Sequence, residues 1–237
     1  MLLYYNHIYV QIRLGSPGVT THTLPELRVV AHRFVPEQLC AGHVALDFIN
    51  TAAGLNRDPR DWLDSYDGLL AWARAAGLLD KAFLGDLAAR NHSHPKEGRA
   101  ALERVRRLRA ALYTLFHHRR DATRPPIAAV AMLQQWCRRA GASIALQPKH
   151  DGILVRSLAS CGLDAIAASI ALQAADLLSW RGPGALSVCG GHNCGWIFLD
   201  TSPTRRRRWC NMKTCGNAAK ASRHYRRSRA KPDSIIS

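Results

Sequence analysis

Apolar residues recur at intervals of three and four over most of the chain between residues 68 and 180. In the stretch 96–119 the stripe runs through Leu102, Val105, Leu108, Leu112, Leu115 and Phe116. One-sided spacing of this kind is typical of helices that pack on a core. It predicts helices over 68–76, capped by Asp67, and over 81–90, 96–119, 127–140 and 165–180. In the helix 127–140 we expect Val130, Leu133 and Trp136 to point inward.

Period-two patterns predict two hairpins. Ile144 and Leu146, and then Ile153 and Val155, flank a polar stretch that ends in Asp-Gly, which favours a tight hairpin turn. Residues 186–188 and 196–199 could pair in the same way around residues 189–194. An isolated strand over 4–12 is cut off by glycine and proline at 15–18.

The expected fold class is therefore mainly α. We expect an N-terminal extension over 1–33, which need not be ordered, and a mostly helical domain with one β-hairpin over 34–181. A small zinc-bound module of one β-hairpin and one helix follows over 185–230. The Gly/Pro segment 181–184 is the expected boundary.

Four cysteines in the C-terminal module form two C-x4-C pairs separated by fifteen residues: Cys189 with Cys194, and Cys210 with Cys215. Two short-range pairs suit one closed tetrahedral Zn²⁺ site, and a segment this small needs such a staple to fold. Two disulfides or four free thiols are the alternatives. We predict one structural zinc ion, because nothing indicates secretion.

Basic residues concentrate around these cysteines. Residues 181–231 hold 12 Lys and Arg against one acid, which is +11 of the net charge of +16. The helix expected from about Ala218 and the run before Cys210 predict a DNA-binding surface, the alternative being a solvated face. Its candidate residues are Arg205, Arg206, Arg207, Arg208, Lys220, Arg223, Arg226 and Arg227.

The residues 194–202, 205–217 and 219–227 resemble the CGNR zinc-finger family of bacterial proteins, which are regarded as transcription regulators. The resemblance implies a regulator of transcription that presents a basic helix to double-stranded DNA. The family name denotes Cys-Gly-Asn-Arg at the last ligand. Here Cys215, Gly216 and Asn217 are followed by Ala218, so one cation is missing at the start of the helix, for which Arg208 or Arg223 could compensate.

Residues 41–51 resemble the opening motif of the domain that precedes such fingers, often described as a stress-induced regulator domain. Val44, Leu46, Phe48 and Ile49 form an expected core set. Beside them Asp47, Asn50 and Thr51 have two interpretations. They cap a helix and satisfy turn amides, or they line a pocket for an unidentified small-molecule effector.

Composition narrows the class of protein. The chain is 47% hydrophobic over 237 residues, enough for one ordinary domain and a small module. No apolar run reaches the length that spans a membrane, and the N-terminus has no signal-peptide features, so we expect a cytoplasmic, nucleoid-associated protein that does not bind membranes. Cys40, Cys137 and Cys161 are expected to be inert thiols.

Other functional readings are weaker. His92 and His94 with His117 and His118 could bind a metal, but histidines on loops and helix ends are more often solvated. Arg99, Arg104, Arg106, Arg107 and Arg109 are expected to form a solvated helix face, with a wider nucleic-acid surface as the alternative. No motif of a known enzyme class is present, and four thiolates leave a zinc ion no open position, so we expect no enzyme.

Three hypotheses of function remain: a DNA-binding regulator whose N-terminal domain senses a signal or forms a homodimer, an RNA- or ribosome-associated zinc protein, and an enzyme that uses Asp47 or the histidines.

Overall fold

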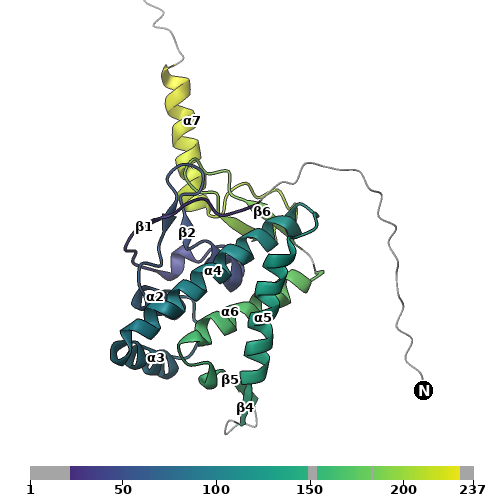
Figure 1. Ribbon diagram of the computed structural model, residues 1–237. Helices are drawn as coiled ribbons and strands as arrows, with labels where there is room; N and C mark the ends of the chain where they lie inside the picture. The colour runs from purple at the N-terminus through teal and green to yellow at the C-terminus, as the bar shows by residue number, and fades with distance from the viewer. Residues whose placement is uncertain (1–21, 149–153, 183, 230–237) are drawn as a thin grey trace, which may run out of the picture.

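The computed structural model describes residues 22–148, 154–182 and 184–229, and this part of the chain is mainly helical (Figure 1). The α-helices are α1 (Val44–Ile49), α2 (Tyr66–Ala75), α3 (Lys81–Ser93), α4 (Pro95–Arg120), α5 (Ile127–Ser143), α6 (Ala165–Ser179) and α7 (Asn217–Arg229). Short 3-10 helices cover Pro36–Gln38 and Ala159–Asp164, and a π-helical turn covers Met212–Gly216. The strands are β1 (Arg28–Val29), β2 (Ala52–Ala53), β3 (Arg60–Asp61), β4 (Ala145–Pro148), β5 (Leu154–Ser157), β6 (Ala185–Val188) and β7 (Ile197–Asp200). The expected fold class is confirmed.

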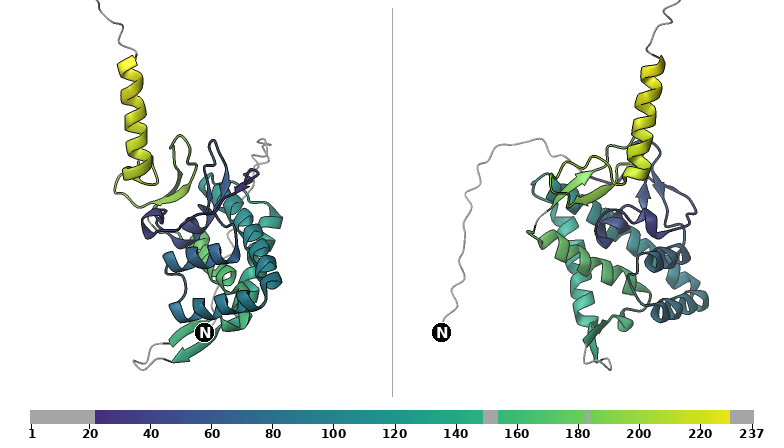
Figure 2. Two further views of the ribbon diagram at one scale, coloured as in Figure 1. Left: turned by 90° about the vertical axis from the view of Figure 1, so that its left-hand side faces the viewer. Right: turned by 180° about the vertical axis from the view of Figure 1, so that it is seen from behind.

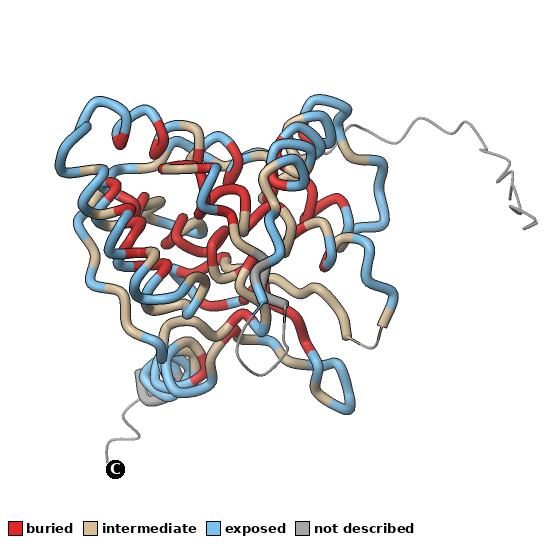
Figure 3. Tube along the Cα trace, turned by 90° about the horizontal axis from the view of Figure 1, so that it is seen from below, coloured by how far each residue is buried: buried red, intermediate tan, exposed pale blue. Residues whose placement is uncertain are grey.

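Helix α6 is the centre of the core, where it packs against α1, α4 and α5. Five of its alanines, Ala165, Ala167, Ala168, Ala171 and Ala174, are fully buried and small enough to let these helices approach closely. Buried residues lie along the middle of the chain trace in Figure 3 and exposed ones at its edge. The segment Ala159–Ser179 is long and apolar enough to cross a membrane, contrary to our reading of the sequence, but most of it is buried inside the protein.

Three small sheets complete the described part of the fold. β3 pairs with β1 in parallel and with β2 antiparallel. β4 and β5 form the predicted hairpin, and β6 and β7 the second one. The predicted Asp151-Gly152 turn and the predicted strand over 4–12 lie outside the described residues.

The last part of the predicted N-terminal extension is folded. Residues 28 and 29 form β1, and the Thr114 hydroxyl donates a hydrogen bond of 2.7 Å to the carbonyl of His22. His22 also forms an ion pair of 2.8 Å with Asp121. Residues 22–33 therefore belong to the helical domain, because β1 completes a sheet whose central strand, β3, lies within it.

Several local predictions are wrong. Ser65, and not Asp67, caps α2: its hydroxyl accepts a hydrogen bond from the amide of Gly68 at 3.0 Å. Helix α3 continues to Ser93, so the break before α4 is confined to His94. Val130 is 44% exposed on α5, whereas Trp136 on the same helix is buried as expected. Periodicity alone does not decide such positions, because α5 is packed on one side by α4 and α6.

Candidate metal centre and nucleic-acid interface

The four predicted ligand cysteines meet at one point of the structure. Their sulfur atoms lie within 4.8 Å of one another, and the Cys194–Cys210 and Cys210–Cys215 pairs are 3.7 Å and 3.8 Å apart. Four sulfurs at about 2.3 Å from a tetrahedral Zn²⁺ ion stand roughly 3.8 Å from each other. A disulfide needs about 2.05 Å, and all four thiols are free. The cluster therefore has the dimensions of a zinc–thiolate site.

The backbone around the sulfurs holds them in place. The hairpin of β6 and β7 presents Cys189 and Cys194, and the Cys189 amide donates to the carbonyl of Trp196 at 2.8 Å. The amide of Cys210 donates to the Cys189 sulfur at 3.3 Å, which favours a thiolate there. Gly191, inside the first pair, packs closely on the second, since a Cβ atom there would stand 3.0 Å from the Cys215 sulfur.

The electrostatics of the cluster favour a bound cation. Hydrogen bonds from the Cys194 and Cys210 thiols hold the pKa of Cys189 well below its usual range. The same Cys189 bond raises the pKa of Cys194 far above its usual value. Four crowded sulfurs thus resist shared ionisation. A divalent ion removes that conflict, because a coordinated thiol is deprotonated outright.

The first cysteine pair is attached to the helical domain through hydrogen bonds across the sequence. The side-chain amide of Asn50 pairs with the backbone of Ile197 in both directions: its Nδ2 donates to the carbonyl at 2.9 Å and its Oδ1 accepts from the amide at 3.1 Å. The Leu55 amide donates to the carbonyl of Cys194 at 2.9 Å, and Asn56 to that of Gly191 at 2.7 Å. These hydrogen bonds join the metal centre to the helical domain.

The residues proposed for an effector pocket make hydrogen bonds to the protein itself. Asp47 accepts a hydrogen bond from the amide of Ala41 at 3.0 Å, and burial raises its pKa to about 6. The Thr51 hydroxyl donates to the carbonyl of Phe48 at 2.7 Å and accepts from Arg109 at 2.8 Å. Asn50, as described above, bonds to the backbone of Ile197. All three residues thus bond to backbone groups of the protein, as the first of the two interpretations expected.

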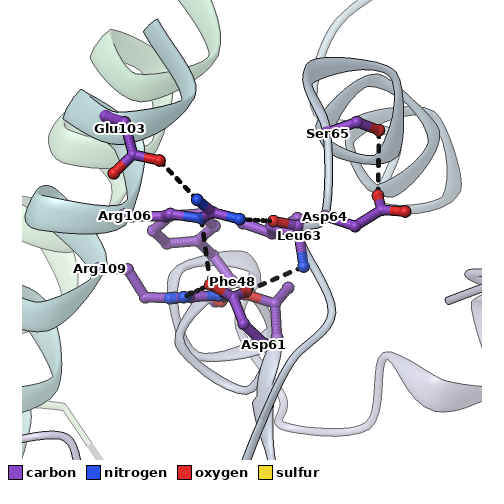
Figure 4. Close-up of polar contacts among 9 residues, drawn as sticks. Phe48, Asp61, Leu63, Asp64, Ser65, Glu103, Arg106 and Arg109 are labelled. Atoms are coloured by element: carbon purple, nitrogen blue, oxygen red, sulfur yellow. Dashed lines mark hydrogen bonds and ion pairs between the residues drawn. The ribbon is translucent and has the colours of Figure 1, made fainter. Parts of the chain in front are cut away.

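One of the arginines expected on a solvated face is buried. Arg109, only 2% exposed, makes two hydrogen bonds to Asp61, at 2.7 Å and 2.6 Å (Figure 4). Arg106 joins the same carboxylate at 3.1 Å and donates to the carbonyl of Leu63 at 2.6 Å. The expectation of solvation is wrong for Arg109 because its position on α4 faces the strand β3.

Some of the proposed DNA contacts converge on one groove. A hollow of about 930 Å³ lies between the first cysteine pair and α7. Arg208, Arg223 and Arg226 line it, as does Ala218, and all four residues are exposed. Lys220, Arg205 and Arg206 are exposed outside the lining. The side chain of Arg227 lies outside the described part of the chain.

Arg207 has a different role from its neighbours. Its guanidinium donates to the carbonyls of Trp209 at 2.9 Å, of Cys40 at 3.3 Å and of Cys210, and it lies 4.7 Å from the centre of the Phe198 ring. These bonds hold the loop 201–209 against the hairpin. We therefore remove Arg207 from the proposed DNA contacts, since its charge is directed into the protein.

Helix α7 stands away from the rest of the protein (Figure 2). Among the described elements, its one substantial packing partner is the turn Met212–Gly216 that carries Cys215. It has 13 residues, five of them Lys or Arg and none acidic. Isolated helices of this length are marginal in water, and neighbouring like charges weaken them further. The charge of this helix is therefore not balanced by acidic residues of its own.

The sequence did not reveal several residues around the site. Arg57 contacts His192 beside the first cysteine pair, and the amide of Asp58 donates to Asn193 Oδ1 at 3.2 Å. Cys40, expected to be a scattered thiol, borders the same cavity as Cys210. Among the described residues, the four cysteines are the one group gathered closely enough to hold a metal, so no histidine site is found there.

The fold and the site together define a helical domain joined to a zinc finger. Residues 42–180 match the family ABATE, described as "Putative stress-induced transcription regulator", and residues 186–228 match the CGNR zinc finger. The first match covers more than half of the chain, so the protein belongs to the ABATE family. No curated protein is significantly similar to it. The predicted resemblance and the single structural zinc held by four cysteines are confirmed.

Proposed function

We propose that the protein is a cytoplasmic, nucleoid-associated regulator that binds double-stranded DNA through α7 and the groove beside it, and that it is not an enzyme. The observation that supports this is the placement of α7: the turn Met212–Gly216, which carries Cys215, fixes the start of the helix, and the helix points away from the rest of the described protein. Thirteen residues make a rod of about 20 Å, and the major groove is wide enough to accept it.

The groove suits a phosphate backbone beside the helix. Arg208 comes from the loop before Cys210, and Arg223 and Arg226 come from α7, so three cations from two elements face one hollow. Ala218, which replaces the family arginine, lies in the same lining. Arg208 and Arg223 thereby supply positive charge where that arginine would begin the helix. Lys and Arg on phosphates give salt-dependent affinity without sequence preference.

The test is the binding of zinc-loaded protein to duplex DNA, measured by fluorescence anisotropy with a random-sequence pool. The variant Arg223→Gln/Arg226→Gln should bind at least tenfold more weakly and show a salt slope smaller by about two. The matched control is Lys96→Gln/Arg99→Gln, which removes the same charge from an exposed face of α4. It should bind like the unmodified protein.

Two outcomes would refute the proposal. Equal losses in both variants would mean that overall charge alone drives binding. Preference for structured RNA over the duplex, at matched salt, would favour the RNA-binding hypothesis instead.

A further inference from the structure

A cavity of about 400 Å³ lies where the helical domain meets the zinc finger, and none of the functions above uses it. Its walls come from residues 37–62 on one side and 193–215 on the other. The volume is in the range of small-molecule sites. Cys194, Cys210 and Cys215 also line it, so the metal centre borders the cavity. The three residues proposed for the effector are absent from its lining.

Two indole rings form walls of the cavity. Trp62 is stacked on His32 with the ring centres 3.7 Å apart and the planes 2° apart. Trp196 stands edge-on to Trp62 at 5.5 Å and 87°. Both tryptophans line the cavity, together with Ala53 and Gly54 of the helical domain. Aromatic rings held in this way favour a planar, mostly apolar ligand.

The polar groups of the lining indicate the charge of that ligand. The indole Nε1 of Trp196 is buried and has no acceptor among the described residues. Lys213 is exposed, and no described carboxylate forms an ion pair with it. Arg60 is already paired with Asp58, and Glu37 is the one acid of the lining. One free cation and one free donor suit a single carboxylate.

We propose that this junction cavity binds a planar aromatic monocarboxylate, whose ring lies against Trp62 and Trp196 and whose carboxylate is held by Lys213. Lys213 belongs to the turn that begins α7, and Trp196 lies two residues from Cys194. The ligand therefore touches both the helical domain and the base of α7, and it regulates DNA binding. This regulatory part rests on the proposed function; the binding itself does not.

The binding is tested by calorimetry on the full, zinc-loaded protein without DNA. The probes are naphthalene-2-carboxylate and its neutral counterpart naphthalene-2-carboxamide. We expect the carboxylate to bind, and the carboxamide to bind about two- to fivefold more weakly. Lys213→Gln should remove this difference. Thr214→Phe, which places a ring at the rim of the cavity, should abolish both.

The control is Lys96→Gln, an exposed cation on α4 that should change neither affinity; zinc content and thermal midpoint show that each variant is folded. No heat from the carboxylate at concentrations on the order of 1 mM would overturn the proposal. So would undiminished binding by folded Thr214→Phe, or a charge preference that survives Lys213→Gln.

The regulatory part is tested by adding the carboxylate to the duplex-binding assay. We expect the Kd for DNA to shift about fivefold or more, with the same factor in the Kd of the carboxylate when DNA is present. An unchanged Kd for DNA would overturn regulation. A protein that binds the carboxylate with the expected variant pattern but binds no DNA would refute the proposed function and leave the cavity assignment standing.

Discussion

Single polar side chains connect parts of this protein that lie far apart in the sequence. The amide of Asn50 replaces a strand neighbour for Ile197, 147 positions away, and it is 4% exposed. Arg109 and Asp61 connect α4 to β3 in the same manner. A buried polar group is costly unless it is paired, so each of these contacts fixes one arrangement of the elements.

Asn50→Ala should lower the free energy of unfolding by about 2–4 kcal/mol, because it leaves the buried amide and carbonyl of Ile197 without partners. Urea unfolding measures the loss. The matched control is Asn56→Ala, which removes one hydrogen bond from an exposed side chain and should cost less than about 1 kcal/mol. Equal losses of unfolding free energy in the two variants would show that the Asn50 hydrogen bonds stabilise the protein no more than the exposed Asn56 bond does.

His117 should make the protein less stable in mild acid. Burial, with the charges of Arg120 and His22, lowers its pKa to about 4, below the ordinary 6.5. The unfolded chain therefore binds the proton first, and stability falls as the pH drops from 6.5 toward 4, by up to about 3 kcal/mol. His118 and Asp121 contact His22 in the same cluster.

The measurement is urea unfolding at about pH 7 and about pH 5, with zinc content monitored. His117→Gln should lose most of the slope, whereas His92→Gln, an exposed control on α3, should keep it. A slope that survives in His117→Gln would assign the acid sensitivity to other groups.

At the scale of elements, the zinc finger depends on its neighbours for its hairpin and on the metal for its helix. β6 and β7 contact α4 and α1, and Phe198 is fully buried. Among the described elements, α7 packs mainly on the turn Met212–Gly216 before it. The two halves of the finger should therefore differ in local stability.

Hydrogen exchange should show this difference in the zinc-loaded protein. The free energy of opening for the amides of β7 should approach that of global unfolding. Amides of α7 beyond about Ala221 should exchange nearly freely, and they should become protected when duplex DNA is added. Equal protection of α7 with and without DNA would show that the helix has a partner within the protein.

The sequence predicted elements and local chemistry well, for a physical reason. Cysteine pairs separated by four residues and apolar stripes with helical spacing are local patterns. They can be recognised in the sequence because the residues involved lie close together in the chain. Arg107 and Arg109 look alike in the sequence, yet only Arg109 is buried, because its direction depends on where β3 lies. Asn50 and Ile197 have no local signal at all, and Ser65 and Asp67 are both acceptable caps two residues apart.

The whole molecule should respond to zinc in two stages. Cys215→Ala removes one ligand of a closed site, so we expect loss of zinc and unfolding of residues 205–229. The hairpin of β6 and β7 should remain, held by Asn50 and by the packing of Phe198, so the helical core should lose little of its far-ultraviolet circular dichroism.

Zinc release is measured with a colorimetric chelator and the folded core by circular dichroism and proteolysis. Cys161→Ala, a buried cysteine away from the metal, is the control and should keep the zinc. A Cys215→Ala protein that retains one equivalent of zinc would contradict the four-ligand site.

The hydrogen bonds from residues 50–58 to the first cysteine pair also limit how this finger can be reused. A chimera that transplants only residues 186–228 onto another carrier would leave the backbone of Ile197 and Cys194 facing water or foreign side chains. In this family an exchange of the helical domain should therefore preserve residues 50–58, and exchange of the finger alone should be rare.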